Sequence, residues 1–228
     1  MNTSSLKTII YTANFGGYDR VHEPMSYDKN CTYLLFTDSL NLKSKIWDVI
    51  RVAIPKETDS QMYARYYKLN PHLVLPEHNV SLWVDSSFQI KRIPIKQILQ
   101  SNPWDIVCYS HPNRRCIYEE AVACINKKLD YREIIANQID FYRNEGFPVN
   151  HGLFATGIMI RRNSDLVCLF NEHWWQQVQN GSRRDQLSQM YSSWKTGCLI
   201  SAFNVGRTIY KNPYFRKLPH NIERQIHG

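Results

Sequence analysis

Short apolar segments recur along this chain, and segments with the residue pattern of a helix separate many of them. The clearest apolar segments span residues 8–13, 33–37, 81–84 and 106–109. Each has the length of a typical strand in a globular protein. Short strands that alternate with helices favour an α/β fold. The chain is therefore predicted to form a mainly parallel central sheet flanked by helices.

Helical patterns fill several of the intervals between strands. The tetrapeptide Thr58-Asp-Ser-Gln is a helix-start signal before the first of them, and Pro71 closes that helix. Helices are predicted at residues 62–69, 95–100, 118–129, 131–143, 166–178 and 185–194. Further strands are predicted at residues 47–52, 157–161, 199–203 and 208–210.

The composition is that of a globular protein. The 228 residues, 43% of them hydrophobic, are enough to bury one continuous core, and no repeat or Gly/Ser linker divides them, so one domain is expected. No apolar run approaches the roughly 18–20 residues that cross a bilayer. The polar N-terminus leads into an apolar segment too short for a signal peptide. The six cysteines form no C-x-x-C pair, so buried free thiols are expected. These features predict a cytoplasmic location.

The net charge of +8 indicates an anionic partner: nucleic acid, an acidic membrane surface or a phosphorylated small molecule. The basic residues form dispersed doublets, such as Arg114-Arg115 and Arg183-Arg184, and no basic tail. Arginines that converge on one pocket suit a diphosphate, because the guanidinium fork matches phosphate oxygens. For any one doublet, solvated surface charge is the alternative. A peripheral contact with the anionic inner face of a membrane is a further expectation.

Two of the predicted strands end on aspartates. Asp38 follows residues 33–37, and Asp85 follows residues 81–84. Parallel strands bring their carboxyl ends to one edge of a sheet, and ligands of α/β proteins bind beyond that edge. We therefore expect Asp38 and Asp85 to face the same nucleotide site.

The segment Asp85-Ser-Ser87 suits coordination of a divalent ion, because hard cations prefer carboxylate oxygen. The alternative is an aspartate that caps a turn. An apolar strand that ends in this way resembles the GT-A glycosyltransferases, whose D-x-D motif binds a metal and a nucleoside diphosphate. The second acidic position is Ser87, which departs from that motif. The resemblance therefore implies Mn²⁺ or Mg²⁺ at Asp85 and Ser87, held weakly, with the late histidine His220 as a third ligand.

Five sequence blocks, in this order, sharpen the resemblance: Tyr11-Thr-Ala-Asn-Phe-Gly-Gly-Tyr-Asp19, Ala64-Arg-Tyr-Tyr-Lys-Leu-Asn-Pro-His72, Trp83-Val-Asp85, His111-Pro-Asn-Arg114 and Arg184-Asp-Gln-Leu-Ser188. From about Lys7 to Lys195 they resemble the TOD/MUCI-type glycosyltransferase-like family, also known as domain of unknown function 616. The resemblance implies a single GT-A (Rossmann-like) domain. Its nucleotide-binding half would span about residues 1–110 and its acceptor-binding half about residues 111–228.

The donor nucleotide is expected to contact the ends of the first strands and one helix. Two glycines after Asn14 let the backbone approach a flat ligand, and Asp38 can accept a hydrogen bond from a base or ribose. Arg65 and Lys68 are three residues apart, hence on one helix face, from which they can reach phosphates or remain solvated. The predicted donor-binding residues are Thr12, Ala13, Asn14, Tyr18, Asp38, Arg65, Lys68, Asp85 and Ser87.

The acceptor and the transferred sugar are expected to lie against the second half. Glycines before a strand leave room for a sugar ring, and tryptophans offer it a stacking surface. Asp185 is predicted to be the catalytic carboxylate, as a base for the acceptor hydroxyl or as a ligand of a sugar hydroxyl. A carboxylate at a helix N-terminus is the structural alternative. The predicted substrate-binding residues are His111, Arg114, Gly152, Thr156, Gly157, Trp174, Arg184 and Gln186.

The function expected from these features is transfer of a hexose from a nucleoside diphosphate sugar, UDP-linked in the first instance, to a hydroxyl of a glycan or glycolipid, as in polysaccharide biosynthesis. One alternative is a sugar-phosphate nucleotidyltransferase, although the long Gly-rich basic loop of those enzymes is absent. Another is a basic nucleic-acid-binding module, although no RRM, KH or helix-turn-helix signature is present. No nucleic-acid partner is therefore expected.

Overall fold

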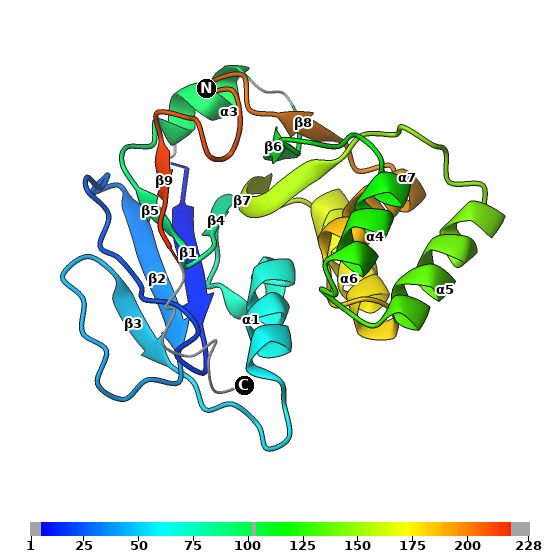
Figure 1. The fold of residues 1–228 in the computed structure, drawn as a ribbon. Coiled ribbons are helices and arrows are strands. Elements are labelled where there is room, and N and C mark those ends of the chain that lie inside the picture. Colours follow the sequence, from blue (N-terminus) through cyan, green and yellow to red (C-terminus); the bar gives the residue numbers. More distant parts are fainter. Residues whose placement is uncertain (1–5, 102–103, 220–228) are drawn as a thin grey trace.

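The fold is organised around a central sheet. In residues 6–101 and 104–219, which the computed structural model describes, seven strands form this sheet in the order β3-β2-β1-β4-β7-β6-β8 (Figure 1). In chain order these strands are β1 (Thr8–Asn14), β2 (Cys31–Thr37), β3 (Asp48–Arg51), β4 (Val80–Val84), β6 (Ile106–Ser110), β7 (Phe154–Arg162) and β8 (Ile200–Ala202).

Six of the seven sheet strands in the described residues point the same way. The neighbours β3, β2, β1 and β4 pair in parallel, and β8 pairs in parallel with β6. Only β7 is reversed, since it pairs antiparallel with both β4 and β6. The predicted mainly parallel α/β sheet is therefore confirmed. The carboxyl ends of β1, β2 and β4 lie at one edge, and the reversed β7 begins at that same edge.

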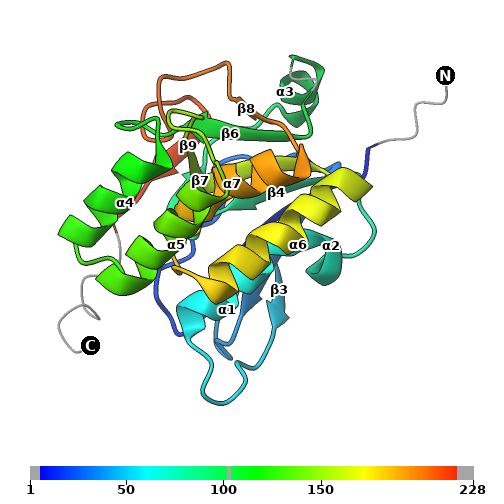
Figure 2. The same cartoon turned by 90° about the vertical axis from the view of Figure 1, so that its right-hand side faces the viewer.

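Helices pack on both faces of the sheet because the strands are apolar on both faces. In chain order, they are α1 (Ser60–Leu69), α2 (Pro71–Val74), α3 (Ile95–Ser101), α4 (Ile117–Asn126), α5 (Arg132–Asn144), α6 (Asp165–Asn180) and α7 (Gln186–Thr196). Figure 2 shows α1, α6 and α7 in front of the sheet. Among the described residues, no helix combines the length and apolar character needed to cross a bilayer.

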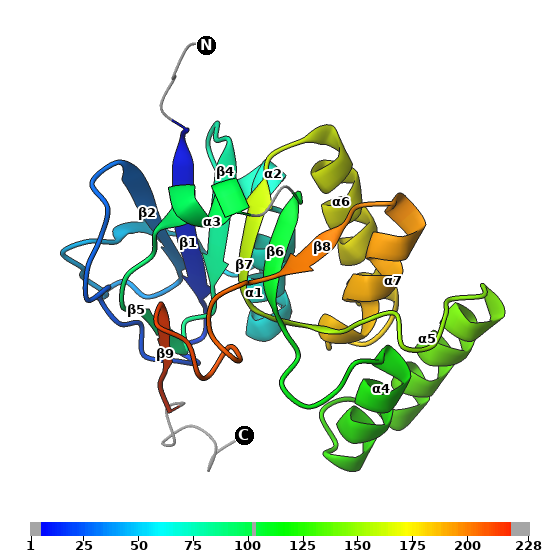
Figure 3. The ribbon, with the colours of Figure 1, turned by 90° about the horizontal axis from the view of Figure 1, so that it is seen from above.

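Alternation along β1 divides the core into two layers. Ile10 packs with Ile95 and Leu99 of α3, whereas Ile9 and Tyr11 pack with the cluster under α1 and α6. A third cluster joins α4, α5 and α7, and Figure 3 shows α4 and α5 standing out from the sheet beside α7. The edge at which β1, β2 and β4 end is therefore bordered by elements from both the first and the second part of the chain.

Two short strands escaped the sequence prediction, and one predicted strand is wrong. β5 (Phe88–Ile90) and β9 (Phe215–Lys217) pair antiparallel in a separate two-stranded sheet. Neither segment has a local residue pattern that predicts a strand. Residues 208–210 form a tight turn closed by a single bridge between Thr208 and Lys211, so no strand forms there. Pro71 ends α1 as predicted and also opens α2, where its missing N–H costs no hydrogen bond.

Candidate active site

A cavity of about 340 Å³ opens at the carboxyl edge of the sheet. The end of β1, the end of β4, the first residues of β7, one face of α1 and the N-terminal end of α7 surround it. Its charged lining residues in the described chain are Asp19, Asp85 and Asp185 with Arg65, Lys68, Arg184 and Lys217. Such mixed charge in one cavity suits a ligand that carries both phosphates and sugar hydroxyls.

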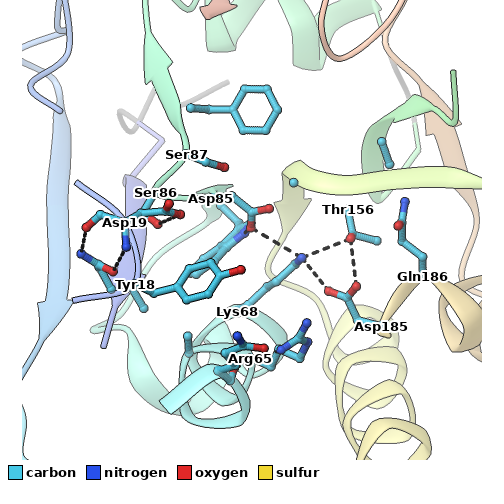
Figure 4. A pocket seen from close by; sticks show the side chains of 18 of the residues that line it. Tyr18, Asp19, Arg65, Lys68, Asp85, Ser86, Ser87, Thr156, Asp185 and Gln186 are labelled. Atoms are coloured by element: carbon cyan, nitrogen blue, oxygen red, sulfur yellow. Dashed lines mark hydrogen bonds and ion pairs between the residues drawn. The ribbon is translucent and has the colours of Figure 1, made fainter. Parts of the chain in front are cut away.

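Lys68 is the central cation of this cavity. Its side chain is buried, and its Nζ lies 2.6 Å from Asp185 Oδ2 and 3.6 Å from Asp85 Oδ1. It also donates a hydrogen bond of 3.1 Å to the hydroxyl of Thr156 (Figure 4). The ammonium group therefore contacts residues at the end of β4, at the beginning of β7 and at the beginning of α7.

Asp185 points into the cavity and does not cap its helix. It occupies the N-cap position of α7, but its side chain makes no capping hydrogen bond. Its Oδ1 accepts a hydrogen bond of 3.1 Å from Thr156, and its Oδ2 faces Lys68. Burial raises the pKa of this carboxyl, but the positive charges of Lys68, Arg65 and Arg184 outweigh burial and lower the pKa to about 2. Asp185 is therefore an anion near neutral pH and a weak base.

Two arginines add donors to the cavity wall. Arg65 lies within α1, and its Nη1 donates a hydrogen bond of 3.3 Å to the carbonyl of Gln61. Arg184 lies just before α7 and also lines the cavity. The Nε atoms of both are buried without a hydrogen-bond acceptor among the described residues. A buried donor without an acceptor is costly, so its presence in a cavity wall fits an anionic ligand.

The turn after β4 is held from three sides. Trp83 Nε1 donates to Asp85 Oδ1 at 2.6 Å, Ser86 Oγ donates to Asp19 Oδ2 at 3.0 Å, and Lys217 Nζ donates to Ser87 Oγ at 2.5 Å. On the neighbouring strand β7, Gly157 approaches the turn closely, because a Cβ there would lie 3.0 Å from Asp85 Oδ2. Only glycine fits at this position without displacing Asp85.

The loop after β1 forms another wall of the cavity. Asn14 and Asp19 exchange two hydrogen bonds, Asn14 Nδ2 to the Asp19 carbonyl at 2.6 Å and Asp19 N to Asn14 Oδ1 at 3.1 Å. Tyr18 lies between them, 46% exposed, and also lines the cavity. A fixed loop with an accessible aromatic ring is a suitable surface for a nucleobase.

One comparison of sequences identifies the family. The family model of the TOD1/MUCI70, glycosyltransferase-like domain matches residues 1–223. The chain belongs to this family. Among curated proteins, no match to the chain is found. The resemblance expected from the five sequence blocks is confirmed, and the cavity is the candidate active site of a glycosyltransferase-like domain.

Most of the donor-binding residues predicted for this glycosyltransferase-like domain line the cavity: Ala13, Asn14, Tyr18, Arg65, Lys68, Asp85 and Ser87. Two do not. Thr12 is buried within β1, and Asp38 accepts hydrogen bonds of 3.0 and 3.1 Å from the backbone N–H of Gly16. Asp38 and Asp85 do follow parallel strands at one edge, but the Asp38 carboxylate supports the loop and stays outside the cavity wall.

The predicted substrate-binding residues divide in the same way. Thr156, Gly157, Arg184 and Gln186 line the cavity beside Asp185. Trp174 is wrong as a sugar platform, because it is fully buried under the sheet and its Nε1 donates to the Asp185 carbonyl at 2.9 Å. Its helical spacing from Phe170 and Val178 places all three on the core face of α6.

His111, Arg114 and Gly152 also lie outside the cavity wall. Arg114 Nε binds the carboxylate of Glu120, and His111 Nε2 lies 3.6 Å from the same carboxylate. Burial lowers the pKa of His111, while the Glu120 charge acts in the opposite direction. Gly152, at φ +97°, provides the left-handed turn that leads into β7. These residues hold the loops beside α4 together.

The cation implied by the GT-A resemblance does not fit the donors present. His220 lies outside the described residues. Of the other two expected ligands, Ser87 Oγ already accepts a hydrogen bond from the Lys217 ammonium, and Asp85 Oδ1 accepts one from Trp83. Within the described chain, no group of three or more His, Cys, Asp or Glu side chains is placed to hold a metal ion. Of the expected ligands that the structure describes, only Asp85 is a carboxylate, so the turn offers a divalent cation fewer charged ligands than a complete D-x-D motif.

Sequence reasoning missed two charged residues of the cavity, Asp19 and Lys217. Asp19 ends the block that includes Tyr18, so its position in that block was the available signal. Lys217 carries no local signal, because only the pairing of β9 with β5 brings it to the cavity.

Proposed function

We propose that this chain is a glycosyltransferase that moves a hexose from a nucleoside diphosphate sugar, UDP-linked in the first instance, to a hydroxyl of a glycan or glycolipid. The observation that carries this proposal is the position of Lys68, buried between the carboxylates of Asp85 and Asp185. A glycosyltransferase-like domain supports the general reaction class. The donor and the acceptor are inferred from the chemistry of the cavity.

The diphosphate fits the cationic part of the cavity. Lys68, Arg65 and Lys217 project from α1 and β9 into the space beside the β4 turn. The loop that contains Asn14 and Tyr18 borders the same space and offers a surface for the base. Preorganised cations at the position where charge develops stabilise the leaving group without reorganisation.

The transfer breaks the bond between the anomeric carbon and the diphosphate oxygen, and the electron pair stays with the diphosphate. The acceptor hydroxyl oxygen forms the new bond to that carbon and loses its proton to water. A group whose pKa is about 2 is a poor proton acceptor near neutral pH. Asp185 therefore acts as a charged hydrogen-bond acceptor that orients a sugar hydroxyl and stabilises positive charge at the anomeric carbon.

The test is a donor screen with a product readout. UDP, GDP and CMP sugars are incubated with the protein and glycan or glycolipid acceptors, and the release of free nucleotide and glycosylated product is quantified by mass spectrometry. Glycosyl transfer with release of a nucleoside diphosphate supports the proposal. Reaction of a sugar phosphate with a nucleoside triphosphate, with release of pyrophosphate, indicates a nucleotidyltransferase. Tight binding of single-stranded RNA without turnover indicates a nucleic-acid-binding module.

Comparison of a cavity variant with a matched surface variant tests whether the measured activity depends on the cavity. Arg65→Gln removes a cavity cation and is expected to reduce turnover by about 10–100-fold, the usual effect of losing one charge-assisted contact. Lys43→Gln removes an exposed lysine of the same charge outside the cavity and is expected to leave turnover unchanged. Equal turnover in both variants would place the reaction elsewhere.

A further inference from the structure

We propose that the ammonium group of Lys217 takes the place of the divalent cation in this domain and binds the leaving diphosphate directly. This inference rests on the proposed function. It assigns a catalytic role to a residue outside the family-like sequence blocks, and it predicts donor binding without metal.

Several independent contacts hold Lys217 at the β4 turn. In the β5–β9 ladder it pairs with Phe88, which comes directly after Asp85-Ser86-Ser87. The next residue, Leu218, donates its backbone N–H to the Ser87 carbonyl at 2.9 Å. The Nζ atom lies 2.5 Å from Ser87 Oγ and 4.9 Å from the centre of the Phe88 ring. Backbone and side chain thus place one positive charge at the second acidic position of a D-x-D motif.

The surrounding charges favour an ammonium group there. Burial lowers the pKa of Lys217, while the carboxylates of Asp85 and Asp19 act in the opposite direction and favour its charged form. Both carboxylates also line the cavity. In a metal-dependent site, two carboxylates attract a divalent cation. Here they attract the ammonium of a lysine that a strand pair fixes in position.

Serine at position 87 is consistent with this exchange. A second carboxylate would add a negative charge and draw Lys217 into an ion pair, whereas the Ser87 hydroxyl only accepts one hydrogen bond. An ammonium group has three N–H donors, so it can contact more than one oxygen at this end of the cavity. Lys68, whose Nζ lies 3.6 Å from Asp85 Oδ1, adds a second ammonium to the lining of the same cavity. Two lysines can then share the negative charge that develops on the diphosphate when the glycosidic bond breaks.

Titration calorimetry with UDP and with GDP, each in EDTA and in Mn²⁺, tests the inference. The wild-type chain is expected to bind one of them in EDTA, with an affinity that Mn²⁺ changes by less than about threefold. Lys217→Gln is expected to weaken that binding by about 10–100-fold, as for loss of a charge-assisted hydrogen bond. Lys217→Arg keeps the charge and is expected to retain most of the affinity. Lys211→Gln, an exposed lysine on the same segment, serves as the control and is expected to bind like wild type.

A reciprocal variant tests the exchange itself. Ser87→Asp combined with Lys217→Ala restores the D-x-D motif and removes the ammonium, so its UDP or GDP binding is expected to depend on Mn²⁺. Wild-type binding that requires Mn²⁺, or a folded Lys217→Gln that binds like wild type, overturns the inference and leaves the proposed function standing. If Lys217→Gln does not fold, the other two variants test the inference. Lys217→Arg is then expected to bind nearly as tightly as wild type, and the double variant is expected to bind only with Mn²⁺; failure of either result overturns the inference. Failure of wild type to bind UDP, GDP or their sugars under any condition defeats the proposed function and this inference together.

Discussion

Lys68 Nζ and Asp185 Oδ2 lie 2.6 Å apart, and both side chains are more than 90% buried. A buried pair of this kind is costly to break, because removal of one partner leaves the other charge without compensation. The pair also joins α1, which carries Arg65 and Lys68, to the residue that precedes α7. The same contact therefore contributes to stability and to the organisation of the cavity.

Lys68→Met is expected to destabilise the fold by about 3–5 kcal/mol, because Asp185 loses its nearest counter-ion in a buried site. The double variant Lys68→Met/Asp185→Asn removes both charges and is expected to recover part of that loss. Urea denaturation of the two single variants and the double variant measures the coupling. Additive losses in the double variant would show that the pair is not coupled.

Asp185→Asn is expected to reduce turnover by about 10²–10³-fold while UDP binding persists, as for loss of one group that stabilises transition-state charge. The amide can keep the hydrogen bond from Thr156 but removes the charge that faces the sugar. It also releases Lys68 from its counter-ion, so affinity for the diphosphate is not expected to fall. Turnover, UDP affinity and the free energy of unfolding are measured on one sample. Near-normal turnover in a destabilised variant would leave Asp185 with a structural role only.

Stability is expected to fall in acid as Asp185 is protonated. The pKa of Asp185 is about 2 in the folded chain against an ordinary value of 3.8, so the charged form favours folding. This contribution, roughly 2 kcal/mol, is present above about pH 4 and is lost as the pH falls towards 2. Denaturation curves of wild type and Asp185→Asn between pH 2 and 6 test it: the difference in unfolding free energy should shrink below pH 4. A constant difference would show that the charge of Asp185 does not stabilise the fold.

Asp38→Ala is expected to weaken nucleotide binding by about five- to tenfold through the loop after β1. The carboxylate accepts the Gly16 N–H, and this loop carries Tyr18. One lost hydrogen bond is worth about 1 kcal/mol. Asp48→Ala, at an exposed position of β3, is the charge-matched control. The UDP affinities of the Asp38→Ala and Asp48→Ala variants are compared by calorimetry. Equal affinities would show that the hydrogen bond between Asp38 and Gly16 is not needed for nucleotide binding.

Gly157→Ala is expected to disturb the cavity more than its small size indicates. The added Cβ would lie 3.0 Å from Asp85 Oδ2 and 3.1 Å from Phe88 Cε2, so these two side chains must move by a few tenths of an ångström. Overpacking of this kind costs about 1–3 kcal/mol. Thermal unfolding and UDP affinity are both expected to fall, and an unchanged affinity would show that the turn can move without consequence.

Helices and strands with a clear local residue pattern could be predicted from the sequence. Elements that form only by pairing with a distant segment could not. Asp85 and Asp185 were both identified, because one ends an apolar strand and the other opens a helical pattern in a family-like block. The orientation of the Asp38 carboxylate depends on the conformation of Gly16, which the sequence does not specify. Lys217 depends on β9, which forms only against β5. Trp174 fails for a different reason: a tryptophan suits both a core and a sugar platform, and only burial distinguishes them.

The reversed direction of β7 has a consequence for how such a domain can diversify. Because β7 enters the cavity with its first residues, Thr156 and Gly157 are connected in the chain to α4, α5 and the loop before β7, and not to β1 or α1. Insertions or substitutions in that preceding region can reshape one wall of the cavity while the donor-side wall keeps its own supports. Under the proposed function, a lineage built on this arrangement could acquire a different acceptor through changes in one stretch of chain and still use the same donor.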